Sequence, residues 1–136
     1  KGDARAFSEK TNTMIEQSMR QLVKGICDAH GVSYEVKYET TCPMTFNQPE
    51  QANSATKAAI SLLGPDKCNS DIEPRSFSED FSIMSKSTPG CFVLMGNGIS
   101  GSHGRPLHSA DYDFNDELLV KGSSYWVELA EQQLKS

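Results

Sequence analysis

Residues 8–39 decide the fold, and they read SEKTNTMIEQSMRQLVKGICDAHGVSYEVKYE. In the first part of this stretch, apolar side chains recur with the spacing of one face of a helix. These side chains are Ile15, Met19, Leu22, Val23, Ile26 and Cys27. Ser8 is a suitable N-cap, and Gly31 is the usual type of residue at a helix end. We therefore predict a helix over residues 9–30.

The second part of the stretch alternates strictly between aromatic or apolar and charged side chains. Tyr34, Val36 and Tyr38 share one face of an extended chain, and the charged residues share the other. This pattern predicts a strand over residues 33–39 with one packed face and one wet face. We expect another strand over residues 2–7, before the helix. The strand–helix–strand unit is incomplete, because two strands covered by one helix are marginally stable alone.

The remaining sequence predicts three more helical segments and one strand. A helix over residues 49–63 begins at Pro49 and stops before Gly64. A helical turn is expected over residues 80–85, and Asn115 is expected to cap a last helix. The predicted buried side of that helix is Leu118, Leu119, Gly122, Trp126 and Leu129. The wholly apolar run over residues 91–95 favours a strand buried on both faces.

Composition limits the class of protein. A chain of 136 residues has the size of one ordinary domain, and 37% hydrophobic residues is typical of a soluble globular protein. The net charge of -5, with scattered basic residues, argues against nucleic-acid binding. No apolar run is long enough for a membrane helix, and the first residues lack the apolar core of a secretory signal. We expect a cytoplasmic protein with no membrane partner.

The cysteines stand far apart, with no CxxC or CxxxC pair among Cys27, Cys42, Cys68 and Cys91. A structural zinc site usually contains such a pair, so the spacing disfavours one. Cysteines spread in this way are more often buried apolar residues than a disulfide framework. This usage favours an intracellular origin.

The long loop over residues 96–113 is the expected place for chemistry, because ligand sites gather where buried strands end. Its polar side chains are Asn97, His103, Arg105, His108, Ser109, Asp111 and Asp113. Pro106 limits how His108 is presented, and a neutral imidazole is a common metal ligand. From spacing alone, a histidine that hydrogen-bonds the loop backbone is favoured at His108, and a solvated one at His103. Residues 98–102 lack the G-x-S-x-G order of a serine nucleophile.

Charged residues at two other places could each have a structural or a functional role. Arg5 lies in the expected strand over residues 2–7, where a salt bridge is the default, but its planar fork also suits a carboxylate ligand. Glu79 and Asp80 stand together at the expected start of a helical turn, where acids commonly cap a helix. Their alternative is a place near an active site, in a role that stays open.

Three segments, taken in order, resemble one family. They are GDARAFS over residues 2–8, SEDFS over residues 78–82 and PLHSADYDF over residues 106–114. These are similar to the G-x-x-R-x-F, G-E-D-F-S and P-L-H-x-x-x-x-D-F motifs of the metal-dependent hippurate hydrolases, N-acyl-amino-acid amidohydrolases and auxin-conjugate hydrolases, which are relatives of the aminoacylases. Ser78 stands where the family usually has glycine.

The resemblance implies an α/β fold and two domains. Residues 1–42 would be the second half of a ferredoxin-like lid domain, and residues 43–136 the C-terminal part of a zinc-peptidase-like catalytic domain. His108 would be the last ligand of a two-metal centre holding Mn, Zn, Co or Ni, and Arg5 would bind substrate. The remaining ligands and the glutamate base are absent from this sequence, which therefore resembles a C-terminal fragment with no catalytic residue of its own.

The function implied is hydrolysis of N-acyl amino acids by metal-activated water in the complete enzyme, with the present chain inactive alone. The unfinished half-sheet predicts self-association, as a homo-oligomer, or pairing with the rest of the enzyme. One alternative is a non-enzymatic binding or interaction module derived from this family. Another is a structural-zinc protein that uses the four cysteines.

Overall fold

The computed structural model describes residues 1–135 and divides into two compact units. The first unit comprises Lys1–Phe46 and Ile72–Pro89, and the second comprises Asn47–Asp71 and the chain from Gly90 onward. Each unit has its own packing. The predicted boundary after residue 42, between a lid domain and a catalytic domain, concerns the complete enzyme and stays a prediction.

The first unit is built on α1, Glu9–His30, which confirms the predicted helix. The Thr11 amide donates to Ser8 Oγ at 3.0 Å, so Ser8 satisfies one of the unpaired N–H groups of the first turn. Gly31 ends the helix in the left-handed region, at φ 63°, where a residue without Cβ is unstrained. Both ends were readable from the sequence because each depends on neighbouring residues only.

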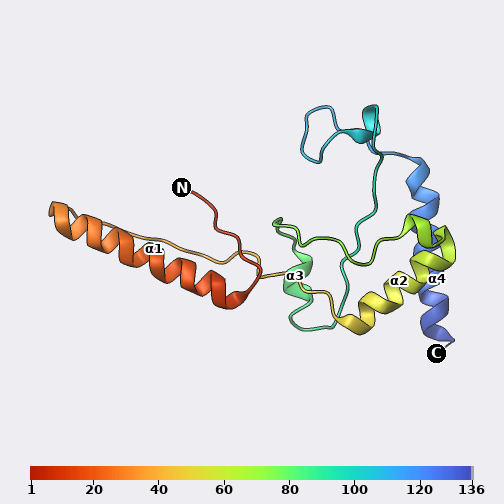
Figure 1. Ribbon diagram of the computed structural model, residues 1–136, viewed down its shortest axis with the longest axis horizontal. Helices are drawn as coiled ribbons and strands as arrows, with labels where there is room; N and C mark the ends of the chain where they lie inside the picture. The colour runs from red at the N-terminus through yellow and green to blue at the C-terminus, as the bar shows by residue number, and fades with distance from the viewer. Residues whose placement is uncertain (136) are drawn as a thin grey trace. The chain divides into compact units, whose positions relative to one another are not determined.

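The chain returns from α1 as an extended segment that runs back along the helix (Figure 1). Arg20 Nη1 donates to the Val36 carbonyl at 3.1 Å, and Tyr38 Oη donates to Asn12 Oδ1 at 3.0 Å. The apolar stripe of α1 stays open: Leu22 is 64% exposed and Ile26 is 60% exposed. Within the described residues, this unit therefore has a helix with an apolar face and no core beneath it.

The predicted strands over residues 2–7, 33–39 and 91–95 are not formed, and residues 1–135 contain helices and turns but no strand. The α/β expectation is therefore not confirmed by residues 1–135, whose regular elements are helical. The physical reason is that a strand exists only when its backbone N–H and C=O groups pair with another extended segment. The alternating pattern marks sequence suited to a sheet, and no described segment is placed to pair with it.

The second unit is built on α2, Pro49–Leu63, and α4, Glu117–Leu134, which pack side by side (Figure 1). The α2 bounds confirm the prediction. Ala55 and Ala58 present small side chains, and Tyr125 of α4 is buried against that region, only 6% exposed. Tyr125 Oη donates to the Ala55 carbonyl at 3.4 Å, so the one polar atom of this ring has a partner.

The predicted buried side of α4 was partly wrong. Trp126 is 68% exposed and Leu119 is 58% exposed, whereas the buried residue is Tyr125. The residue of α4 that is buried is the one that packs against the alanines of α2, and the hydrophobicity of α4 alone does not show where those alanines lie. The N-cap of α4 is Asp116, one residue after the predicted Asn115, although the Glu117 amide does donate to Asn115 Oδ1 at 3.1 Å.

Short elements complete the chain: η1 Pro65–Lys67, α3 Phe81–Met84 and η2 Ser102–Gly104. The α3 turn confirms the helical turn predicted at residues 80–85. All four cysteines are half-buried free thiols, and burial raises the pKa of the Cys91 thiol. No helix in residues 1–135 combines the length and the hydropathy that crossing a membrane requires.

Candidate functional site

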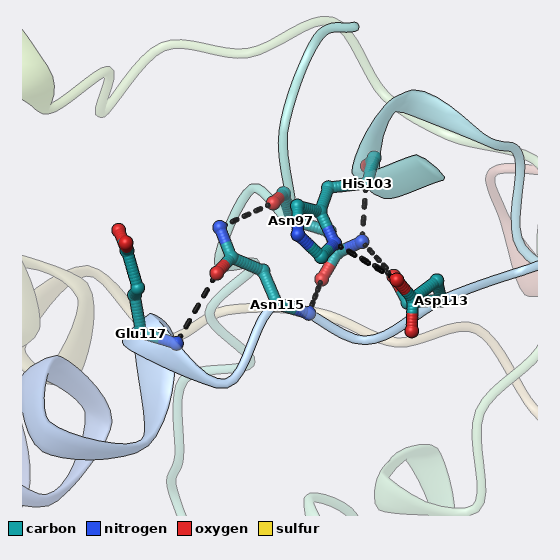
Figure 2. A network of polar contacts seen from close by, with 5 residues as sticks. All are labelled: Asn97, His103, Asp113, Asn115 and Glu117. Carbon is teal, nitrogen blue, oxygen red and sulfur yellow. Dashed lines mark hydrogen bonds and ion pairs between the residues drawn. The ribbon is translucent and has the colours of Figure 1, made fainter. Parts of the chain in front are cut away.

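The loop over residues 96–113 is organised around Asn97 (Figure 2). Asn97 Nδ2 donates to the His103 carbonyl at 3.0 Å and to the Asp113 carbonyl at 2.8 Å. On the other side of the carboxamide, the Asn115 amide donates to Asn97 Oδ1 at 2.8 Å. Asn115 Nδ2 also donates to the Asn97 carbonyl at 3.2 Å. One side chain thus links the start, the middle and the end of the loop.

His103 belongs to this network, and its side chain is also partly open to solvent, as the sequence predicted. Its side chain is 39% exposed, and Nδ1 lies 3.6 Å from Asp113 Oδ2. The same nitrogen lies 3.3 Å from the Asp113 carbonyl oxygen. The two residues are distant in sequence, so only the folded loop brings them together.

Two glycines allow the loop to fold closely on itself. A Cβ at Gly98, whose φ is +155°, would lie 2.8 Å from the Cβ of His103. A Cβ at Gly104 would lie 2.8 Å from the Ile99 carbonyl carbon. Neither space accepts a side chain without movement, so the approach of residues 98–99 to residues 103–104 depends on glycine.

His108 lies at the tip of an inner loop that is closed twice. Arg105 Nε lies 3.0 Å from Asp111 Oδ2, and the Ser109 amide donates to the Pro106 carbonyl at 3.2 Å. His108 has φ 67°, and it is the only non-glycine residue with positive φ in the described chain. A left-handed backbone is uncommon for a residue with a Cβ, and such conformations concentrate at functional sites.

The His108 imidazole is exposed and makes no hydrogen bond or ion pair within residues 1–135. The alternative of a histidine tied to the loop backbone is therefore not observed. Beside it, the buried Ser109 hydroxyl has no hydrogen-bond partner among the described residues. Buried polar groups normally have partners, so the Ser109 hydroxyl fits a site that other groups complete.

The described residues do not form a metal site by themselves. No group of three or more His, Cys, Asp or Glu side chains within residues 1–135 is arranged to hold a metal ion. A catalytic metal usually needs at least three protein ligands, and His108 supplies one candidate. Any metal chemistry at this loop requires donors beyond those described here.

Arg5 lies in the first unit, exposed to solvent. Its Nη1 donates to the Ser76 carbonyl at 3.0 Å, and the default expectation of a salt bridge is not seen among the described residues. A guanidinium has five N–H donors, so most of them are left for another group. The backbone contact fixes the arginine without neutralising its charge, which suits a residue that binds an anion.

The paired acids Glu79 and Asp80 precede α3. Asp80 occupies the N-cap position but makes no side-chain capping bond, so the helix-capping interpretation is wrong for its carboxylate. Instead, the buried Ser82 hydroxyl donates to the Glu79 carbonyl at 2.6 Å. Backbone and hydroxyl groups hold the turn. The geometry assigns no role to the two carboxylates.

Comparison with known proteins agrees with the three sequence segments. Residues 5–132 match the family model described as Peptidase family M20/M25/M40, and the chain therefore belongs to this family. Members of the family are generally metal-dependent. Membership is in keeping with a piece of a peptidase domain, and it confirms the resemblance to the amidohydrolases.

Among curated relatives, hippurate hydrolase from Campylobacter jejuni is 28% identical over 135 residues, which is 99% of this chain and 34% of the relative. The YhaA protein of Bacillus subtilis (strain 168), whose amidohydrolase name is provisional, is 35% identical over 124 residues, covering 88% of this chain and 30% of the relative. Thermostable carboxypeptidase 2 of Saccharolobus solfataricus is 29% identical over 125 residues, covering 90% and 30%.

The chain thus spans about a third of the length of the curated relatives it matches. All three names describe hydrolases. No solved structure matches the chain.

Sequence reasoning found the loop and His108 but gave no role to Asn97. Asn97 appeared only as one polar residue of the loop, because the carbonyls it holds belong to His103 and Asp113. The short Gly96-Asn97-Gly98 run was the available signal, since glycines beside a small amide are typical of a tight turn.

Proposed function

We propose that the full-length protein is a metal-dependent amidohydrolase that cleaves N-acyl amino acids of the hippurate type. Family membership and the names of the relatives support a hydrolase. The observation that carries the proposal within this chain is His108. Its backbone adopts the left-handed conformation at the tip of a closed loop, and its exposed imidazole has no partner among the described residues.

Each proposed role follows from the chemistry of the residue. His108 offers a neutral imidazole to a divalent metal, and Arg5 offers a planar cation to the carboxylate of the N-acyl amino acid substrate. A bound divalent metal would supply the Lewis acidity that makes water a nucleophile near neutral pH. Manganese, zinc, cobalt and nickel all accept imidazole and carboxylate ligands, so the choice among them rests on groups outside this chain.

Amide hydrolysis by the full-length protein, assayed on N-benzoylglycine, is expected to stop after chelation and to return when a divalent metal is added back. The 136-residue chain alone is expected to show no hydrolysis, because His108 by itself cannot hold a metal. Product release measured by chromatography, with metal content measured in parallel, checks both statements. Full activity in metal-free enzyme, or turnover by the 136-residue chain, would contradict the proposal.

The competing function is a non-enzymatic interaction module, and the same assay separates the two. A module would bind a partner without releasing benzoate and glycine from the substrate. Metal added to the full-length protein would then change neither the product trace nor the bound partner.

We also propose that the open face of α1 is covered by a second copy or by the remainder of the enzyme. Sedimentation velocity of the 136-residue chain is expected to show association, because Leu22 and Ile26 expose a continuous apolar stripe. Replacing both with Glu should weaken association. The matched control places the same charges at Gln17 and Gln21 and should leave it unchanged. A folded monomer at high concentration would contradict this.

A further inference from the structure

We propose that Asn97 is a positioning residue that fixes where His108 is held. The inference rests on the proposed function only for the use made of His108, because the geometry of the loop is independent of it. The segment that carries His108 leaves the network at His103 and returns to it at Asp113. A single nitrogen, Asn97 Nδ2, donates a hydrogen bond to the carbonyl of each of these two residues, at 3.0 Å for His103 and 2.8 Å for Asp113.

Three closures are nested around His108. Asn97 closes the outermost loop by joining the carbonyls of residues 103 and 113. The Arg105–Asp111 ion pair closes the next, and the hydrogen bond from the Ser109 amide to the Pro106 carbonyl closes the innermost. The ion pair is exposed, so it contributes little stability on its own. The outermost closure is the only one of the three that spans the whole segment from residue 103 to residue 113, and the contact of His103 Nδ1 with the Asp113 carbonyl, at 3.3 Å, lies at the same point.

The chemistry at Asn97 requires a carboxamide. Its nitrogen faces two carbonyl oxygens, and its oxygen accepts a hydrogen bond from the Asn115 amide. This arrangement needs a donor on one side and an acceptor on the other, which only Asn provides at this length. An ionised aspartate has the same shape but would set a negative oxygen against two carbonyl oxygens.

The packing around the carboxamide is close. Gly98 lies against His103, and a Cβ there would come within 2.8 Å of the histidine Cβ. At the other end, the backbone amide of Asn115 donates to Asn97 Oδ1, and the side chain of Asn115 accepts from the Glu117 amide at the start of α4. Asn97 thus ties the His108 segment to the start of α4, an element packed against α2 in the same unit.

The test uses full-length protein carrying Asn97→Ala or Asn97→Asp, with Asn47→Ala as the matched control. Asn47 makes a comparable pair of carboxamide bonds: its Nδ2 donates to the Phe92 carbonyl at 3.1 Å, and its Oδ1 accepts from the Phe92 amide at 2.7 Å. It lies in the same unit but outside the His108 loop. Loss of either asparagine should lower the melting temperature, so stability alone does not distinguish them.

Two readouts distinguish positioning from general stability. Asn97→Ala should shift the backbone amide NMR signals of residues 103–113 and weaken divalent-metal binding by about tenfold to a hundredfold, as removal of an orienting residue commonly does. Asn47→Ala should do neither. Unchanged loop signals and metal affinity within about twofold of wild type in Asn97→Ala would overturn the proposal, as would equal effects in Asn47→Ala.

Asn97→Asp provides a signature that a purely structural role would lack. Its loop amide signals should be displaced near neutral pH and should move back toward wild type as pH falls, because the protonated acid regains one O–H donor. The facing carbonyl oxygens disfavour the ionised form, which raises the pKa of that carboxyl. Absence of any recovery in the metal-free protein would overturn the proposal, even if Asn97→Ala proves too unstable to study.

The readouts also separate this inference from the proposed function. If removing the His108 side chain leaves metal affinity unchanged, the ligand assignment fails, and the NMR signals still decide the role of Asn97. If removal of His108 abolishes metal binding while Asn97→Ala leaves the loop in place, the positioning role fails and the ligand assignment stands.

Discussion

Replacing His108 with Gly in the full-length protein is expected to reduce kcat/KM for N-benzoylglycine by at least about a hundredfold. Loss of a metal ligand should exceed the tenfold to hundredfold effects seen when only an orienting residue is lost. Stability should change little, within about 1 kcal/mol, because glycine adopts the left-handed backbone at φ 67° without strain. Activity and the free energy of unfolding should therefore separate in this variant.

His108→Ala is a second test of the same loss. It keeps the Cβ that the wild type already carries in this left-handed backbone, so the roughly 1–2 kcal/mol that a Cβ costs there is not added again. Steady-state kinetics, metal content and denaturant unfolding measure activity, metal binding and stability separately. His30→Ala, at the exposed end of α1, is the matched histidine control and should keep normal turnover. Near-normal turnover and metal content in His108→Gly would refute the ligand assignment.

Replacing Arg5 with Ala is expected to raise KM by about tenfold to a hundredfold with a smaller change in kcat. A hydrogen bond to a charged group contributes about 1.5–3 kcal/mol, and each 1.4 kcal/mol is a factor of ten in affinity. The guanidinium is exposed and held by one bond to the Ser76 carbonyl, which leaves donors for the substrate carboxylate. Arg5→Lys should recover only part of the affinity, because an ammonium cannot form the bidentate pair.

Two controls make the Arg5 experiment decisive. Arg75→Ala removes the same charge from an exposed position in the same unit and should leave KM unchanged. A substrate whose carboxylate is replaced by a carboxamide should bind wild type and Arg5→Ala about equally. If Arg5→Ala raises KM for the neutral substrate as much as it raises KM for the acid, Arg5 does not act on the carboxylate.

The helices could be predicted because their ends depend on neighbouring residues. Ser8, Gly31, Pro49 and Gly64 act within one turn of the helix they bound, and the observed limits of α1 and α2 agree with the prediction. The strands could not be judged in this way, because a strand needs a partner from elsewhere. The alternating residues 33–39 lie extended without one, and Arg20 reaches the Val36 carbonyl instead.

The residues of the candidate site also fall into those that the sequence predicted and those that it did not. His108 and Arg5 were found from motifs, since residue type and order survive in the sequence of one chain. Their roles stay predictions that the experiments above test. Asn97 and the His103–Asp113 contact were missed because their partners are set by the path of the loop, where glycine at positions 98 and 104 permits contacts that no local pattern states.

The sequence by itself determined the helices, their ends and the family, because capping, periodicity and motif order are carried by residues near one another or in fixed succession. Tertiary structure alone decided that Tyr125, not Trp126, is buried against α2, and that the extended segments remain without strand partners in the described chain. It also decided that Asn97 closes the loop and that His108 is held with φ 67° at its tip. These features depend on contacts between residues distant in sequence, and such contacts exist only once the chain has folded.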